Sequence, residues 1–177
     1  MAVLAISKLP VRRGVAARDE AVALRGHHYL CLLGYSGAAY TPAFGRHFEG
    51  LIDRINVALR VDGFARLAVV RGRDAVCDPM CPGRFCNSLR VLPIRDARVL
   101  RYLTRLITTH GAEDCLPQGL PVRVGTEVQL DRPLLALMRE VFHDGSIRRG
   151  VCGGCPHERR CTEGAARGFV GAKLELG

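Results

Sequence analysis

The chain has 177 residues, of which 48% are hydrophobic and 24% charged, and its formal net charge at pH 7 is +9. This length and balance are those of one globular domain with a moderate core. No apolar run is long enough to span a bilayer, and Met1–Ile6 is too short and has no basic start for a signal peptide, so we expect a cytoplasmic protein.

Residues 1–22 are expected to form an N-terminal extension, because they mix Pro10, Gly14 and three arginines without a sustained period. Leu24–Leu33 is apolar around a polar insert. Thr41–Pro42 then opens a helix, since threonine caps a first turn well and proline suits the position after it. Apolar residues recur at helical spacing as far as Leu59, and Gly63 marks the helix end.

A short strand is predicted over 67–70, where the segment ends in β-branched residues. A cysteine-rich loop follows over 76–88. Asp96 is the expected N-cap of the next helix, whose apolar stripe runs to Ile107 and which Gly111 ends.

Two further short strands are predicted around Val122–Val124 and Val128–Leu130. Asp131–Pro133 starts another helix that stops at Gly145, and a triple-cysteine loop and a short helix over 162–169 follow. The pattern predicts an α+β fold that is predominantly helical.

We expect a single small domain over residues 23–169, followed by a tail over 170–177. Two cysteine-rich loops lie between the predicted helices, and we expect them to converge on one metal site.

Eight cysteines exceed what packing requires in a chain of this length. In a reducing compartment thiols seldom form disulfides, so metal binding or catalysis is their usual role. The densest group is Cys152-Gly-Gly-Cys155-Pro-His-Glu-Arg-Arg-Cys161. Two thiols at C-x-x-C spacing can bind the same metal atom or two corners of one cluster. A third thiol after five intervening residues can bind the same metal centre, and the glycines let the backbone lie close to it. We therefore predict these three cysteines as ligands of a metal or cofactor.

The fourth ligand is expected from the upstream segment Cys77-x3-Cys81-x4-Cys86. Its spacing is common neither in ferredoxins nor in zinc fingers. We predict Cys77 and Cys86 as ligands of the cofactor and keep Cys81 as a weaker candidate.

Cys31 lies in Leu-Cys-Leu-Leu, a setting typical of a small buried hydrophobe. In a helix, however, His27 and Cys31 would share one face at i, i+4. His27, His28 and Cys31 are therefore additional candidate metal ligands, although core hydrogen bonding is the simpler role for His28. Cys115 is interpreted as a bystander.

His157 sits within the triple-cysteine segment and could bind a metal or donate to a cluster sulphur. An exposed loop histidine is the favoured interpretation.

The segment Leu24-Arg-Gly-His-His-Tyr-Leu-Cys-Leu-Leu33, followed by Gly34, Tyr40 and Thr41-Pro-Ala-Phe, resembles the opening of a bacterial and archaeal family catalogued as domain of unknown function 1284. Cys77, Cys86 and the final cysteine triplet also look like the cysteine positions of that family. The resemblance runs from about residue 23 to 165.

The family is identified as iron–sulphur binding proteins without an assigned activity, so the resemblance implies a cofactor class but no reaction. This chain departs from the family pattern in its extra thiols, Cys81 and Cys115, and in its N-terminal extension. It also has Pro156-His157 where an aromatic residue is expected.

Four thiolates suit an iron–sulphur cluster or a zinc ion equally well, and the two sites carry the same formal charge. Structural zinc ribbons usually have two C-x-x-C knuckles, and here there is one, so the spacing leans gently toward a cluster. The resemblance to the iron–sulphur family implies the rest of this preference. The expected cofactor is a cluster of the 4Fe-4S type, with zinc as the alternative. Nearby arginines would offset the anion and raise the reduction potential of a cluster: Arg148, Arg149, Arg159, Arg160 and Arg167.

The leading hypothesis is an iron–sulphur protein that transfers electrons or assists a redox enzyme, with an acidic redox protein as its partner. A zinc-stapled nucleic-acid-binding protein is the alternative. The net charge favours it, but four tyrosines, six phenylalanines and no tryptophan offer few stacking platforms, and the arginines form no basic arm.

A cluster-dependent enzyme using His27 and His28 is the third hypothesis. The sequence contains no nucleophile elbow, phosphate loop or metalloprotease helix, so no catalytic residue is assigned.

Overall fold

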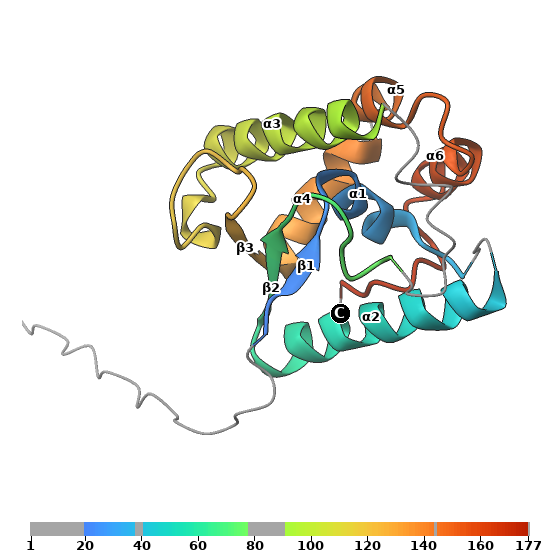
Figure 1. The fold of residues 1–177 in the computed structure, drawn as a ribbon, viewed down its shortest axis with the longest axis horizontal. Coiled ribbons are helices and arrows are strands. Elements are labelled where there is room, and N and C mark those ends of the chain that lie inside the picture. Colours follow the sequence, from blue (N-terminus) through green and yellow to red (C-terminus); the bar gives the residue numbers. More distant parts are fainter. Residues whose placement is uncertain (1–19, 38–40, 78–90, 144, 177) are drawn as a thin grey trace, which may run out of the picture.

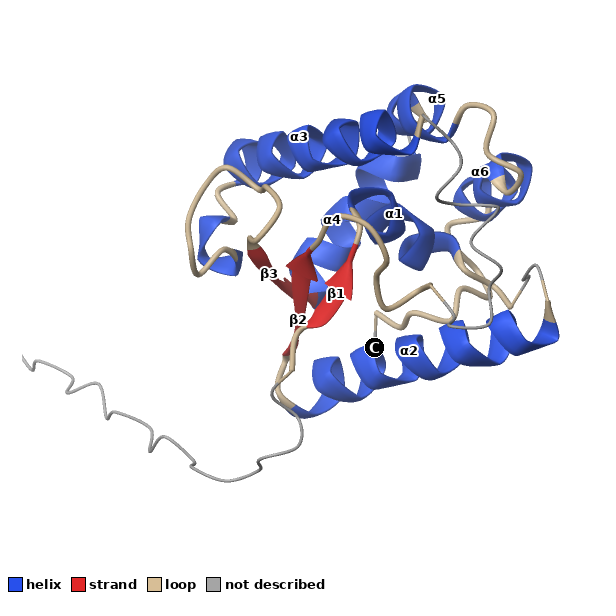
Figure 2. Ribbon diagram, viewed as in Figure 1, coloured by secondary structure: helices blue, strands red, loops and turns tan. Residues whose placement is uncertain are grey.

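The computed structural model describes residues 20–37, 41–77, 91–143 and 145–176. These residues form a small three-stranded sheet, a short 3-10 turn and six α-helices (Figures 1 and 2). In chain order the elements are β1 (Val22–Leu24), α1 (Gly26–Gly34), α2 (Pro42–Val61), β2 (Phe64–Val69), α3 (Leu92–His110), η1 (Glu113–Cys115), β3 (Glu127–Asp131), α4 (Arg132–His143), α5 (Ser146–Cys152) and α6 (Glu158–Ala166). The predicted α+β fold with predominant helix is confirmed.

The strands lie in the order β1-β2-β3, with β1 parallel and β3 antiparallel to β2. Alternate residues of β2, including Leu67 and Val69, are buried, as expected for a strand with one face on the core. Leu67 pairs with Val128 of β3, so the predicted strands at 67–70 and 128–130 both exist.

The strand predicted over 122–124 is wrong. The Thr126 hydroxyl accepts a hydrogen bond from the Arg123 N–H at 3.0 Å, and the Thr126 N–H donates to the Arg123 carbonyl at 2.9 Å. These two bonds close a turn, so the Arg123 N–H is used locally instead of in a strand ladder.

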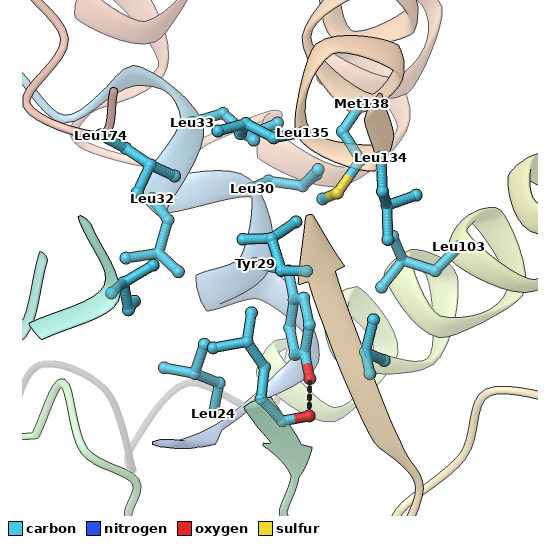
Figure 3. Close-up of a cluster of buried hydrophobic side chains, with 14 of the residues drawn as sticks. Leu24, Tyr29, Leu30, Leu32, Leu33, Leu103, Leu134, Leu135, Met138 and Leu174 are labelled. Atoms are coloured by element: carbon cyan, nitrogen blue, oxygen red, sulfur yellow. Dashed lines mark hydrogen bonds between the residues drawn. The ribbon is translucent and has the colours of Figure 1, made fainter. Parts of the chain in front are cut away.

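Helix α1 is the central element, and in the view of Figure 1 it lies between α2 on one side and α3 on the other. Four of its apolar side chains are almost fully buried. Figure 3 shows Leu30 and Leu33 on the side of α1 that faces α4, and the Tyr29 hydroxyl donating to the Leu67 carbonyl of β2, at 3.0 Å. Each fully buried leucine of this kind stabilises the fold by about 2 kcal/mol.

Two helix starts follow the predicted capping chemistry. The Thr41 hydroxyl accepts from the Phe44 N–H at 3.1 Å, with Pro42 in the first turn of α2. The Asp131 carboxylate accepts from the Leu134 N–H at 2.8 Å at the start of α4. Gly111 ends α3 in the left-handed conformation, at φ 63°, where glycine carries no steric penalty.

The predicted N-cap role of Asp96 is wrong, because α3 begins four residues earlier, at Leu92, and Asp96 lies inside the helix. Its carboxylate instead accepts from residues of α1, described below. The triple-cysteine segment, predicted as a loop, begins at the last residue of helix α5 and contains the start of α6. Helix α6 spans Glu158–Ala166 instead of the predicted 162–169.

The C-terminal segment packs on the core. The Asn56 side chain of α2 donates to the Lys173 carbonyl at 2.9 Å and accepts from the Glu175 N–H at 3.0 Å. The Arg139 guanidinium donates to the Leu174 carbonyl at 2.5 Å, and Leu174 is buried. In the part of the chain that the structure describes, no helix has both the length and the apolar character needed to cross a membrane.

Candidate functional site

The three final cysteines lie on one helix–turn–helix unit. Cys152 ends α5, Cys155 lies in the turn and Cys161 lies in α6. The Cys155 N–H donates to the Cys152 carbonyl at 2.8 Å, and the Glu158 N–H donates to the Cys155 carbonyl at 3.0 Å. Gly154 adopts φ 71°, a conformation that glycine reaches without strain. The chain therefore reverses within a few residues and keeps the three thiols in one region.

Arginines of α3 attach this unit to the rest of the fold. Arg95 donates to the Gly153 carbonyl at 2.6 Å, and Arg98 donates to the Gly150 carbonyl at 2.5 Å. Both bonds satisfy carbonyls at the C-terminal end of α5, where cations also interact favourably with the helix dipole. The turn that carries Cys152 and Cys155 is therefore fixed by a helix some 50 residues upstream.

Cys31 of α1 lies near the same thiols. Burial raises the pKa of Cys31 well above its ordinary value, and the neighbouring Cys161, Cys152 and Cys155 thiols raise it further. Charges affect one another in this way only at short range. Four thiols from α1, α5, α6 and the α5–α6 turn are thus close enough to influence one another.

The same effect operates within the triplet. Burial, Cys161 and Cys155 raise the pKa of Cys152 to about 12, against an opposing effect of Arg95. Burial and Cys155 raise the pKa of Cys161, and Arg148 opposes them. These two thiols are protonated at neutral pH, because Arg95 and Arg148 compensate the repulsion between several thiolates only in part. A cationic metal centre would provide that compensation and displace the protons.

Two adjacent histidines of α1 each contact a carboxylate. His27 Nδ1 lies 2.6 Å from an Asp96 oxygen, His28 Nδ1 lies 2.5 Å from an Asp74 oxygen, and the two ring centroids are 4.1 Å apart. Because an ionised carboxylate only accepts hydrogen bonds, each Nδ1 donates, which leaves Nε2 as the acceptor of the neutral ring. Burial lowers the pKa of His27, against the raising effect of the Asp96 hydrogen bond.

Both carboxylates also bind the start of α1. The Arg25 N–H donates to Asp74 at 2.6 Å, and the Arg25 guanidinium donates to Asp96 at 2.7 and 3.0 Å. Burial alone would raise the pKa of Asp96, but hydrogen bonds from the His27 side chain and backbone and from Arg25 lower it to about 2. Sequence reasoning missed Asp74 and Asp96 in this role, since no local pattern connects residues about 46 and 69 positions apart.

The upstream cysteines are seen only in part. The Cys77 thiol hydrogen-bonds Asp74 and so lies at the edge of the histidine–carboxylate network. The predicted Cys81 and Cys86 sites fall outside the described residues. Cys115 is buried in η1, where burial and then Asp131 raise its pKa to about 11 and no other described cysteine contributes.

His157 directly precedes α6 and is partly buried, and burial followed by Arg160 lowers its pKa. Across the described ranges, no group of three or more His, Cys, Asp or Glu side chains is arranged to hold a metal ion. The expected convergence of two cysteine-rich loops on a metal is therefore not seen there.

No protein-family model matches this chain, and neither a curated protein nor a solved structure matches it. The resemblance to the family of unknown function stays a prediction.

Proposed function

We propose that this protein binds an iron–sulphur cluster of the 4Fe-4S type and uses it to transfer electrons or to assist a redox enzyme. The proposed ligands are Cys152, Cys155 and Cys161, with Cys31 as the fourth. The observation that carries the proposal is that these three thiols each raise the pKa of Cys31. Thiolates are the preferred donors for an iron–sulphur cluster, so thiols close enough to influence one another support this choice of ligands.

The surroundings suit an anionic centre. Arg95 and Arg148 each lower the pKa of one of the thiols, so positive charge already favours the thiolate form that binds iron. A bound cluster would supply one-electron transfer, and arginines beside it would raise its reduction potential by stabilising the more negative reduced form. The single C-x-x-C knuckle favours a cluster over zinc.

The exposed surface of the α5–α6 helix–turn–helix unit is positively charged, which supports an acidic protein as the redox partner. Arg149, Arg160 and Arg167 are exposed around the triplet, whereas Arg159 is paired with Glu163 at 2.8 Å. A positive surface next to a redox centre steers an acidic protein to it and makes association fall with salt.

The ligand assignment is tested by single Cys→Ser variants purified without oxygen. We expect Cys31→Ser, Cys152→Ser, Cys155→Ser and Cys161→Ser to lose most of the visible absorbance and bound iron, because serine is a poor ligand for the cluster iron. Cys77→Ser should retain the cluster, since the Cys77 thiol bonds Asp74. Cys115→Ser is the matched control, being a buried cysteine in η1.

Full cluster content in Cys155→Ser would disprove the triplet assignment. If Cys31→Ser retains iron and Cys77→Ser or Cys86→Ser loses it, Cys31 is not the fourth ligand, and the fourth ligand is a cysteine of the upstream segment. Thermal unfolding of each variant shows whether the substitution removed only a cluster ligand or disrupted the fold. A variant that loses the cluster but stays folded has a lower midpoint of unfolding and still unfolds in a cooperative transition.

A further inference from the structure

A cavity of about 930 Å³ opens between the start of α1, the end of β2, helix α3 and residues 121–124. None of the described cysteines lines it, so it is distinct from the thiol site. Its volume lies in the range of pockets that bind small organic molecules.

The inner surface of this cavity is mostly apolar. Val70, Leu100 and Val122 line it together with two prolines. Among the described lining residues the only hydroxyl is that of Thr104, which already donates to the Leu100 carbonyl at 2.9 Å and accepts from the Val122 N–H at 3.0 Å. The described part of the lining therefore offers no free neutral side-chain hydrogen-bonding group, which suits a hydrocarbon body better than a polar one.

Four exposed arginines surround this apolar surface: Arg71, Arg101, Arg105 and Arg123. Within the described parts of the chain, none of the four has a carboxylate partner. The lining residues that the structure describes include one carboxylate, Asp96, which already binds Arg25 and His27. The lining therefore carries an excess of positive charge with which no carboxylate of the described residues pairs.

The arginines of α3 divide into two sets. Arg95 and Arg98 bond the carbonyls of Gly153 and Gly150 and so support the fold. Arg101 and Arg105 line the cavity at i, i+4, where two like charges disfavour the helix by a few tenths of a kcal/mol. An anion bound between them would remove that repulsion.

We propose that this cavity binds a phosphate or diphosphate ester with a hydrocarbon body. The guanidinium groups would hold the phosphate oxygens through paired, charge-assisted hydrogen bonds, and Val70, Leu100 and Val122 would cover the body. A nucleic-acid strand fits less well, because no aromatic side chain is among the described lining residues to stack on its bases. This inference does not depend on a bound cluster.

The test is calorimetric titration of the full chain, purified without oxygen, with three probes. Geranyl diphosphate has both the charge and the hydrocarbon body, inorganic pyrophosphate has the charge alone, and ADP joins a diphosphate to a polar body. We expect geranyl diphosphate to bind at least about tenfold more tightly than either of the others, since burying several methylene groups contributes more than 1.4 kcal/mol.

Equal affinity for geranyl diphosphate and pyrophosphate would overturn the role of the apolar surface. Tighter binding of ADP than of geranyl diphosphate would contradict the proposal that the ligand has a hydrocarbon body. Cosedimentation with phosphatidylglycerol vesicles that is unchanged by excess geranyl diphosphate would assign the arginines to a membrane surface and overturn the pocket.

The site is located by the double variant Arg101→Gln with Arg105→Gln. Both side chains are exposed and glutamine is a good helix former, so we expect folding to be kept and the affinity for geranyl diphosphate to fall at least about tenfold. Arg46→Gln with Arg54→Gln on α2 removes the same charge from exposed positions outside the cavity and should leave binding unchanged. Equal loss in both variants would show a general charge effect and overturn the site.

Discussion

Asp96 shows how one residue can take a role that its local sequence does not predict. An aspartate before an apolar stripe is typical of a helix N-cap, but here it lies within α3 and binds Arg25 and His27 of another segment. Local capping would have satisfied one or two backbone donors. The observed arrangement instead satisfies a guanidinium, an imidazole and a backbone N–H, and thereby fixes the start of α1.

The Asp96→Asn variant should lower the free energy of unfolding at pH 7 by about 2 to 3 kcal/mol. The pKa of Asp96 is depressed to about 2 in the folded state. Its ionised form therefore stabilises the fold above the unfolded-state pKa of roughly 4, and this contribution is lost as the pH falls toward 2. Urea unfolding of both proteins should show the difference shrinking by roughly half between pH 7 and pH 3.

Asp53→Asn provides the control, because Asp53 is exposed on α2 and its replacement should change stability by less than about 0.5 kcal/mol. A stability difference for Asp96→Asn that stays constant from pH 7 to pH 3 would contradict the role of its ionised carboxylate.

Among the elements, α1 and α3 make an unusually close contact at a glycine. A Cβ atom on Gly26 would lie 2.7 Å from the carbonyl oxygen and 2.9 Å from the Cα of Asp96. Backbone atoms cannot move aside as a flexible side chain can, so a larger residue would push the two helices apart. The contact also sets the position of His27 and Cys31, which follow on α1.

We expect Gly26→Ala to destabilise the fold by about 1 to 3 kcal/mol through overpacking. Gly50→Ala in α2 is the matched control, since a Cβ there meets nothing within 4 Å and alanine favours the helix by about 0.5 to 1 kcal/mol. Chemical denaturation measures both. A stabilised Gly26→Ala protein would show that the α1–α3 contact is not tight.

Elements with strong local signals could be predicted from the sequence. The Thr41–Pro42 and Asp131 starts and the Gly111 end depend on capping within a single turn, and all three occur as expected. The short strand β1 could not, because it has only three residues and its pairing with β2 spans some 45 positions. Helix α5 was missed because the glycines near Cys152 indicated a loop.

For the candidate site, too, only the features encoded by neighbouring residues could be predicted from the sequence. The C-x-x-C spacing made Cys152 and Cys155 candidate ligands because that information is local. The nearness of Cys31 arises from the packing of α1 on α6, more than 100 residues apart, and no spacing rule reports such a contact. The carboxylate partners of His27 and His28 were missed for the same reason.

On the scale of the whole molecule, the proposed cluster would join the first helix to the last two. The C-terminal segment is already tied to the core through Asn56 and Arg139. Thiols from α1, α5 and α6 would add a link between parts of the chain that the backbone keeps far apart. Binding of a metal centre and folding would then be coupled, so removing the iron should lower the midpoint of thermal unfolding.

Metal and sulphide analysis of the unaltered chain, purified without oxygen and combined with its visible spectrum, tests the central claim most directly. We predict a brown protein with close to four irons and four acid-labile sulphides for each chain, as a 4Fe-4S cluster requires. A colourless protein that contains one zinc ion for each chain, or no metal at all, would contradict it.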